Sequence, residues 1–171
     1  ILRETSRYNE FEVVATMPVS QGSWLDTTSD NRIQTQRYRI RLLADNNVQT
    51  STLSETHKPL HVTIYKSATK GYSLVWNAYE GMDIESYRIL RGTSTDNLTQ
   101  IAEVAGSLQN YTDISAPAGT CLYAIAYVPA STQQFAESCA MRSNTSNAYM
   151  LSNAVSTAEA IEAVAATSIE I

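Results

Sequence analysis

The sequence has few cysteines, few charged residues and no long apolar stretch. Of its 171 residues two are Cys, and 17% are charged. Two cysteines allow at most one intramolecular bridge, so the fold must depend on packing rather than on a disulfide framework. So few charges exclude a coiled coil, which is rich in Glu, Lys and Leu. No run approaches the roughly 20 apolar residues that a bilayer-spanning helix needs.

The charge balance argues against nucleic acid as a partner. The chain has 12 Lys and Arg against 17 Asp and Glu, for a net charge of -5, whereas nucleic-acid binders need a cationic surface that displaces phosphate counterions. The first residues also lack the basic start and apolar stretch of a signal peptide. The sequence therefore predicts either a mature chain that begins at Ile1 or a fragment of a longer protein.

Neutral polar residues and tyrosines are abundant instead. There are 19 Ser and 19 Thr, and ten Tyr stand against two Phe and two Trp. Tyrosine packs well on a half-buried pleated surface, so this composition favours β-structure.

The chain contains an internal repeat. Its first six residues, ILRETS, recur as ILRGTS from Ile89, 88 positions later (89 − 1). Further matches follow in the same order: residues 11–15 with 99–103, 24–26 with 111–113, 37–40 with 122–125, and 53–54 with 151–152. The offset drifts only where loops are expected, which predicts two copies of one fold.

Alternating residues within each copy predict half-buried antiparallel strands. Tyr38, Ile40 and Leu42 alternate with arginines, which predicts an apolar inner face and a cationic outer face. Tyr123, Ile125 and Tyr127 repeat this phase in the second copy. Other predicted strands, separated by turn signals, are 61–66, 72–76, 87–91, 98–104, 110–114 and 148–155. Seven short strands in about 98 residues are typical of an immunoglobulin-like sandwich.

Several of these segments resemble a known family. Trp76, residues 87–91 (YRILR), 111–113 (YTD) and 123–125 (YAI) resemble the fibronectin type III pattern, which covers 58–155 almost fully and 1–57 in part. The phrases WNAYEG at 76–81 and HKPLHV at 57–62 resemble tandem domains of bacterial proteins exported by type IX secretion. Residues 167–171 resemble the lead into the sorting domain of those proteins. The resemblance implies all-β fibronectin type III sandwiches in tandem, located outside the cell or on its outer surface.

The first copy is incomplete compared with the second. The second copy has about 31 residues between Lys58 and Ile89, covering two strands and the start of a third, which the first copy lacks. We therefore expect residues 1–57 to form a partial sandwich with an uncovered inner face, and the chain to be a fragment. The expected cover is a cleaved upstream piece, a second copy of the chain, or the tail. The predicted inner-face residues are Ile1, Val13, Trp24, Tyr38, Ile40 and Leu42.

No group of residues predicts catalysis. His57 and His61 are four apart, but Pro59 between them indicates an extended segment, on which they would be about 13 Å apart and unable to share a metal. Asp26 and Asp113 occupy equivalent strand ends and are predicted to form turns by accepting backbone N–H groups. We therefore expect no metal, no cofactor and no enzymatic activity.

Two surfaces are candidates for binding. The loop 129–147 is about 13 residues longer than its counterpart, and loops at strand ends commonly carry recognition; its candidate residues are Phe135, Met141 and Arg142. It also holds Cys139, for which a bridge to Cys121 would require the loop to fold back along a strand of about 25 Å. The alternative is that this loop packs against its own domain.

The second surface is the outward stripe of Arg37, Arg39 and Arg41, spaced at about 6.8 Å. It would suit an anionic partner such as an acidic glycan. The alternatives are a solvated sheet face or an ion pair between domains.

The preferred function is a non-catalytic spacer or adhesion-type module that holds upstream domains of a larger secreted protein away from the surface. The alternative is a carbohydrate- or protein-binding accessory domain of an upstream hydrolase. Residues 156–171 are expected to form a linker or a short helix, since STAE at 156–159 fits a capping box.

Overall fold

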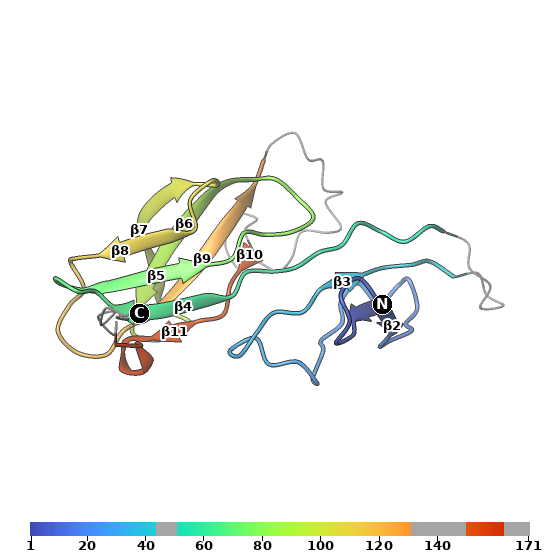
Figure 1. The fold of residues 1–171 in the computed structure, drawn as a ribbon, viewed down its shortest axis with the longest axis horizontal. Coiled ribbons are helices and arrows are strands. Elements are labelled where there is room, and N and C mark those ends of the chain that lie inside the picture. The colour runs from blue at the N-terminus through green and yellow to red at the C-terminus, as the bar shows by residue number, and fades with distance from the viewer. Residues whose placement is uncertain (44–50, 131–149, 163–171) are drawn as a thin grey trace, which may run out of the picture.

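The computed structural model describes residues 1–43, 51–130 and 150–162, and their fold is all-β with antiparallel sheets (Figure 1). One single turn of 3-10 helix, Thr157–Glu159, is the only helix among these residues, so none of them forms a helix able to cross a membrane. The strands are β1 (Leu2–Glu4), β2 (Phe11–Val13), β3 (Tyr38–Arg39), β4 (Val62–Lys66), β5 (Tyr72–Trp76), β6 (Ile84–Gly92), β7 (Leu98–Ala105), β8 (Asn110–Asp113), β9 (Leu122–Pro129), β10 (Met150–Leu151) and β11 (Val155–Ser156).

Residues 58–130 and 150–162, here called the sandwich, form two sheets that pack face to face. One sheet has the order β4-β5-β8 and the other β10-β9-β6-β7, with β11 also pairing with β9. The predicted strands are present with bounds shifted by a few residues. The last one, predicted at 148–155, is divided into β10 and β11, whose separation allows the Ser152 hydroxyl to accept a hydrogen bond from the Ile125 backbone N–H.

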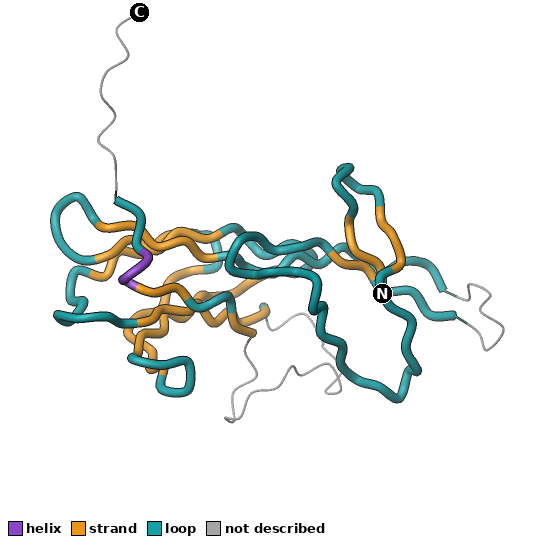
Figure 2. The backbone as a smooth tube through the Cα atoms, turned by 90° about the horizontal axis from the view of Figure 1, so that it is seen from below, coloured by secondary structure: helices purple, strands orange, loops and turns teal. Residues whose placement is uncertain are grey.

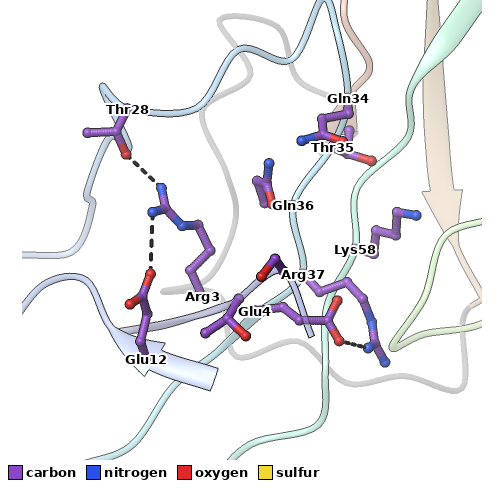
Figure 3. A pocket seen from close by; sticks show the side chains of 11 residues that line it. Arg3, Glu4, Glu12, Thr28, Gln34, Thr35, Gln36, Arg37 and Lys58 are labelled. Atoms are coloured by element: carbon purple, nitrogen blue, oxygen red, sulfur yellow. Dashed lines mark hydrogen bonds and ion pairs between the residues drawn. The ribbon is translucent and has the colours of Figure 1, made fainter. Parts of the chain in front are cut away.

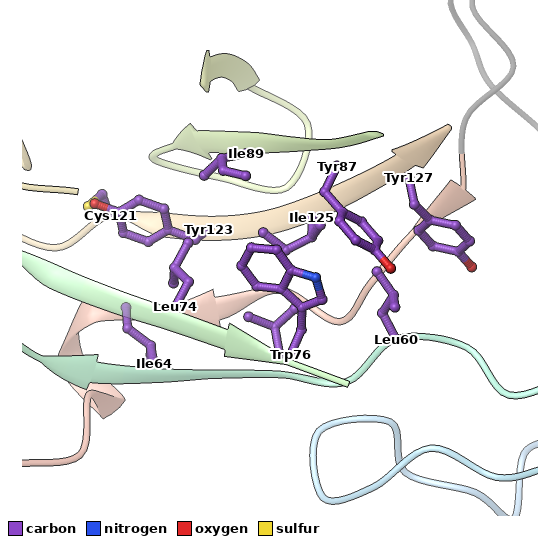
Figure 4. Close-up of a cluster of buried hydrophobic side chains, with 11 residues drawn as sticks. Leu60, Ile64, Leu74, Trp76, Tyr87, Ile89, Cys121, Tyr123, Ile125 and Tyr127 are labelled. Atoms are coloured by element: carbon purple, nitrogen blue, oxygen red, sulfur yellow. The ribbon is translucent and has the colours of Figure 1, made fainter. Parts of the chain in front are cut away.

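The core of the sandwich lies between these sheets (Figure 4). Alternation places every second residue of β9 on its inner face, and Tyr123, Ile125 and Tyr127 are all buried, as predicted. The opposite sheet and the segment leading into it contribute apolar residues from alternate positions. These are Leu60, Val62, Ile64, Leu74 and Trp76.

Residues 1–43 and 51–57, here called the N-terminal region, form one sheet with the order β2-β1-β3. This order repeats β7-β6-β9 of the sandwich, and the register repeats as well. Arg3 pairs with Tyr38 in the N-terminal region, as Arg91 pairs with Tyr123 in the sandwich. The predicted repeat is therefore confirmed as a repeat of strand order and pairing.

The backbone hydrogen bonds along the outer edge of β3 match those along the same edge of β9. The backbone N–H of Ser54 donates to the Ile40 carbonyl at 2.9 Å, and that of Ser152 donates to Ile125 at 2.9 Å. His57 then exchanges backbone hydrogen bonds with Tyr38, at the position where β11 pairs with Tyr123.

One residue of the predicted inner face lies on the other face. Val13 pairs directly with Leu2, so both side chains share the outer face of the sheet. The prediction matched Val13 with Ile101. In the sandwich, β6 and β7 shift register at Ile89/Leu90, so that Leu90 pairs with Gln100. The equivalent of Val13 is therefore Gln100, and a slip of one residue turns a side chain to the opposite face.

The tail closes against the first strand of the sandwich. Ser156 caps the single helical turn by accepting a hydrogen bond from the Ala158 N–H, which confirms its predicted position at the start of a helix. The helix ends after Glu159, because Ile161 exchanges backbone hydrogen bonds with Ile64 and Lys66 of β4. Residues up to 162 thus belong to the sandwich, and the rest of the tail lies outside the described residues.

Candidate functional site

A buried carboxylate connects the two sheets of the sandwich. Asp113, at the end of β8, is fully buried. Its oxygens accept hydrogen bonds from the Arg91 guanidinium at 2.5 Å and from the Tyr123 hydroxyl at 2.7 Å, and these donors belong to the opposite sheet. The Ser115 amide and hydroxyl each donate at 2.8 Å. The carboxylate is satisfied by donors on several sides, so it is structural rather than available to a substrate.

The N-terminal region reproduces this cluster with equivalent residues. Asp26 accepts hydrogen bonds from Arg3 at 2.9 Å and Tyr38 at 2.8 Å. The Thr28 amide and hydroxyl donate to it at 2.9 and 2.6 Å. Both aspartates accept a backbone N–H two residues ahead, which confirms the turn-forming role predicted for them.

Both carboxylates are held in the charged form. Burial opposes ionisation of Asp26, but the hydrogen bonds from Thr28, Tyr38 and Arg3 outweigh it and lower the pKa to about 2. The same balance lowers the pKa of Asp113, where the donors are Tyr123, Ser115 and Arg91. Neither group is suited to act as a general acid near neutral pH.

The arginine stripe lies on the outer face of the N-terminal sheet, where most of its charge is already engaged. Arg37 forms an ion pair with Glu4, and its guanidinium carbon lies 4.9 Å from the centre of the Tyr8 ring. Arg39 lies 4.9 Å from the centre of the Phe11 ring and donates to the Thr56 hydroxyl at 2.6 Å. The Nε of Arg41 is buried without a hydrogen-bond partner among the described residues.

Arg37 also joins the N-terminal region to the sandwich. It donates to both carboxylate oxygens of Glu80, Nε at 2.9 Å and Nη2 at 2.5 Å, and its side chain is only 11% exposed. Hydrogen bonding to Arg37 lowers the pKa of Glu80. Glu80 and Lys58 exchange backbone hydrogen bonds beside this pair, at 3.1 and 3.2 Å. The ion pair between domains, one of the predicted alternatives for this stripe, is therefore present at Arg37.

Two histidines add contacts between the N-terminal region and the sandwich, at the place here called the junction. The Nδ1 of His57 lies 3.0 Å from the Tyr79 hydroxyl, and the Nδ1 of His61 lies 2.8 Å from the Asn31 carbonyl oxygen. Burial raises the pKa of Tyr79 to about 12, so its hydroxyl stays protonated. Gly81, with φ of 102°, lies so close that a Cβ there would stand 2.4 Å from the Thr56 carbonyl oxygen. The junction thus requires glycine at this position.

A shallow polar depression of about 660 Å³ lies beside the junction on the N-terminal region (Figure 3). Arg3 contacts Glu12 and Thr28 on one side of it, and Lys58 lines the other. Gln34, Thr35 and Gln36 complete much of the wall. No group of three His, Cys, Asp or Glu side chains able to hold a metal occurs among the described residues.

The structure brings together one predicted candidate residue, Arg37, and partners that were not predicted. Phe135, Met141 and Arg142, like Cys139, lie outside the described residues, while Cys121 is buried beside β9. The partner of Arg37 was not predicted, because Glu80 is 43 residues away in the sequence and belongs to no repeated pattern. The Arg–Asp–Tyr clusters could have been predicted, since all three residues recur at matched positions of the repeat.

Comparison with known proteins yields little similarity. No family model and no curated protein matches the chain. Among solved structures, a crystal structure of the pectate lyase PelI from Erwinia chrysanthemi in complex with tetragalacturonic acid is similar over 57% of this chain, with 23% identity and a TM-score of 0.40. The match spans 28% of that protein.

Proposed function

We propose that this chain is a non-catalytic spacer, made of tandem fibronectin type III-like modules, within a larger secreted or surface protein of a bacterium. The strand order β4-β5-β8 against β10-β9-β6-β7, and its partial repetition in the N-terminal region, support the module type. Export by type IX secretion belongs to this proposal and rests on the resemblance of residues 57–62 and 76–81.

The junction between the two regions is the observation that carries the proposal. A spacer must keep the domains at its two ends a fixed distance apart, so consecutive modules must not rotate freely about their connection. Here the connection is fastened by the bidentate Arg37–Glu80 ion pair and the His57–Tyr79 contact. The backbone pair between Lys58 and Glu80, inside the sandwich, holds Glu80 in place beside them. The two regions lie end to end, joined by the extended segment that leads into β4 (Figure 2). This arrangement suits a stiff, elongated element.

Small-angle scattering of the wild-type chain and of Glu80→Ala tests the stiffness. The wild-type profile should fit one elongated arrangement, whereas the variant should require a broader distribution of maximum dimensions. Lys66→Ala is the matched control, because it removes the Lys66–Glu162 ion pair inside the sandwich and leaves the junction intact. Identical broad distributions for the wild type and the Glu80 variant would contradict a spacer.

A glycan array and binding to the native cell surface test the recognition function that competes with this proposal. A spacer should give no saturable signal with either. Specific binding that is lost on deletion of residues 131–142 would replace the spacer with an accessory binding module.

A further inference from the structure

The inner face of the N-terminal region, formed by Tyr38 of β3 and by Ile40 and Leu42 just beyond it, is largely exposed where its counterpart in the sandwich is buried. Ile40 is 56% exposed and Leu42 52%, whereas the equivalent Ile125 and Tyr127 are 0% and 2% exposed. Tyr38, equivalent to the fully buried Tyr123, is half-buried. The two faces have matching strand order and register, so the difference comes from what covers them.

In the sandwich, the cover is a two-stranded hairpin together with β8. Strands β4 and β5 pair from Val62↔Trp76 to Lys66↔Tyr72, and they direct Val62, Ile64 and Leu74 onto β6 and β9. Strand β5 also pairs with β8, from Tyr72↔Asp113 to Val75↔Asn110. The hairpin is therefore held both by apolar packing and by backbone hydrogen bonds.

The N-terminal region retains the segment against which such a hairpin would pair. Residues 24–26 are equivalent to the β8 residues 111–113, and Asp26 is fixed by Arg3 and Tyr38 as Asp113 is by Arg91 and Tyr123. Trp24 packs edge-on against Tyr38, with ring centres 6.3 Å apart. Residues 24–26 have no strand partner in the part of the chain that the structure describes. An anchored edge beside an exposed apolar face is the arrangement that β-strand addition uses.

We propose that the inner face of the N-terminal region is a docking site for a two-stranded apolar β-hairpin. One strand of the hairpin would pair with the backbone of residues 24–26, and alternate apolar side chains would cover Tyr38, Ile40 and Leu42. A second copy of this chain fits less well, because its own β4–β5 hairpin is committed to its core, where Ile64 is 3% and Leu74 0% exposed. The proposal does not depend on the spacer function, since a flexible junction would leave this face unchanged.

The probe is the hairpin of the chain itself. A copy of residues 58–88 placed directly before Ile1 reproduces the connection that β4 and β5 have to β6, and tethering keeps the hairpin at an effective concentration of about millimolar or above. The matched control carries the same added copy with Ser in place of its Val62, Ile64 and Leu74 equivalents. Amide hydrogen exchange is measured at residues 24–26 and 38–42, with binding of the dye ANS as a second readout.

The active fusion should slow exchange of residues 24–26 at least tenfold relative to the unmodified chain and reduce ANS binding, while the control should do neither. Equal protection in both fusions, or protection in neither, would overturn the proposal. Sedimentation of the unmodified chain completes the test. A dimer that Ile40→Asp dissociates and Ile114→Asp does not would assign the face to a second copy instead, whereas a monomer agrees with hairpin docking.

Discussion

The N-terminal region and the sandwich contain the same three-stranded arrangement, which is covered by a second sheet only in the sandwich. Both have the same order of three strands and the same pairing of Arg with Tyr. Both also have a cluster in which an Asp carboxylate accepts hydrogen bonds from that Arg and that Tyr, here called the Asp clamp. In the sandwich this sheet is covered by a second sheet, and its inner residues are buried. In the N-terminal region the local pairing persists without that cover. The comparison shows that strand register and the polar clamp do not require a completed core, whereas burial does.

The two Asp clamps should differ in energetic importance, and the change at Asp113 should give the largest loss of stability. Asp113→Ala removes the partner of the Arg91 guanidinium from a fully buried site, so it should lower the free energy of unfolding by about 3–5 kcal/mol. Asp26→Ala should cost about 1–2 kcal/mol, because Arg3 retains Glu12 and Thr28 as partners. Urea denaturation followed by circular dichroism measures the first effect, and hydrogen exchange in the N-terminal region measures the second. Equal losses would mean that the two clamps are energetically equivalent.

The next contrast is between Ile125 and Ile40. Ile125→Ala opens a cavity in the packed core and should destabilise the sandwich by about 2–5 kcal/mol. Ile40→Ala acts on a side chain that is more than half exposed and should cost about 0.5 kcal/mol or less. Thermal unfolding of the two variants beside the wild type tests the pair. A loss above about 2 kcal/mol for Ile40→Ala would show that this face is already covered in solution.

Acid should loosen the N-terminal clamp over a defined range. Asp26 has a pKa of about 2 in the folded chain, below the unfolded value of about 3.9. Its contribution to stability is therefore complete above about pH 5 and is lost as the pH falls through 2. The near-UV circular dichroism of the Trp24–Tyr38 pair should report this loss. Asp26→Asn should flatten the pH dependence, while Asp96→Asn, at an exposed turn, should leave it unchanged.

The ion pair at the junction should give a small effect. A double-mutant cycle of Arg37→Gln and Glu80→Gln should yield a coupling energy of about 0.5–1 kcal/mol, because Glu80 is 41% exposed and solvent screens the pair. The coupling can be measured by hydrogen exchange of the backbone pair between Lys58 and Glu80. Zero coupling would mean that the Arg37–Glu80 ion pair does not help to hold the two regions together.

Much of the fold could be predicted from the sequence, because period-two alternation is a local property. The phase of Tyr123, Ile125 and Tyr127 was correct, and so were the turn role of both aspartates and the cap at Ser156. The prediction failed for Val13, since the register shift between β6 and β7 leaves no local signal in β2. The candidate loop residues Phe135, Met141 and Arg142 remain predictions.

By itself, the sequence determined that the chain is all-β, that one sheet is built twice, and that equivalent Arg, Asp and Tyr residues recur. These features follow from alternation and from self-similarity, which can be read along the chain. Only the tertiary structure decided that Arg37 pairs with Glu80, that the arginine stripe is engaged rather than free, and that Ile40 is exposed where Ile125 is buried. These features depend on which segments, far apart in the sequence, come into contact. Local periodicity carries no information about such long-range contacts.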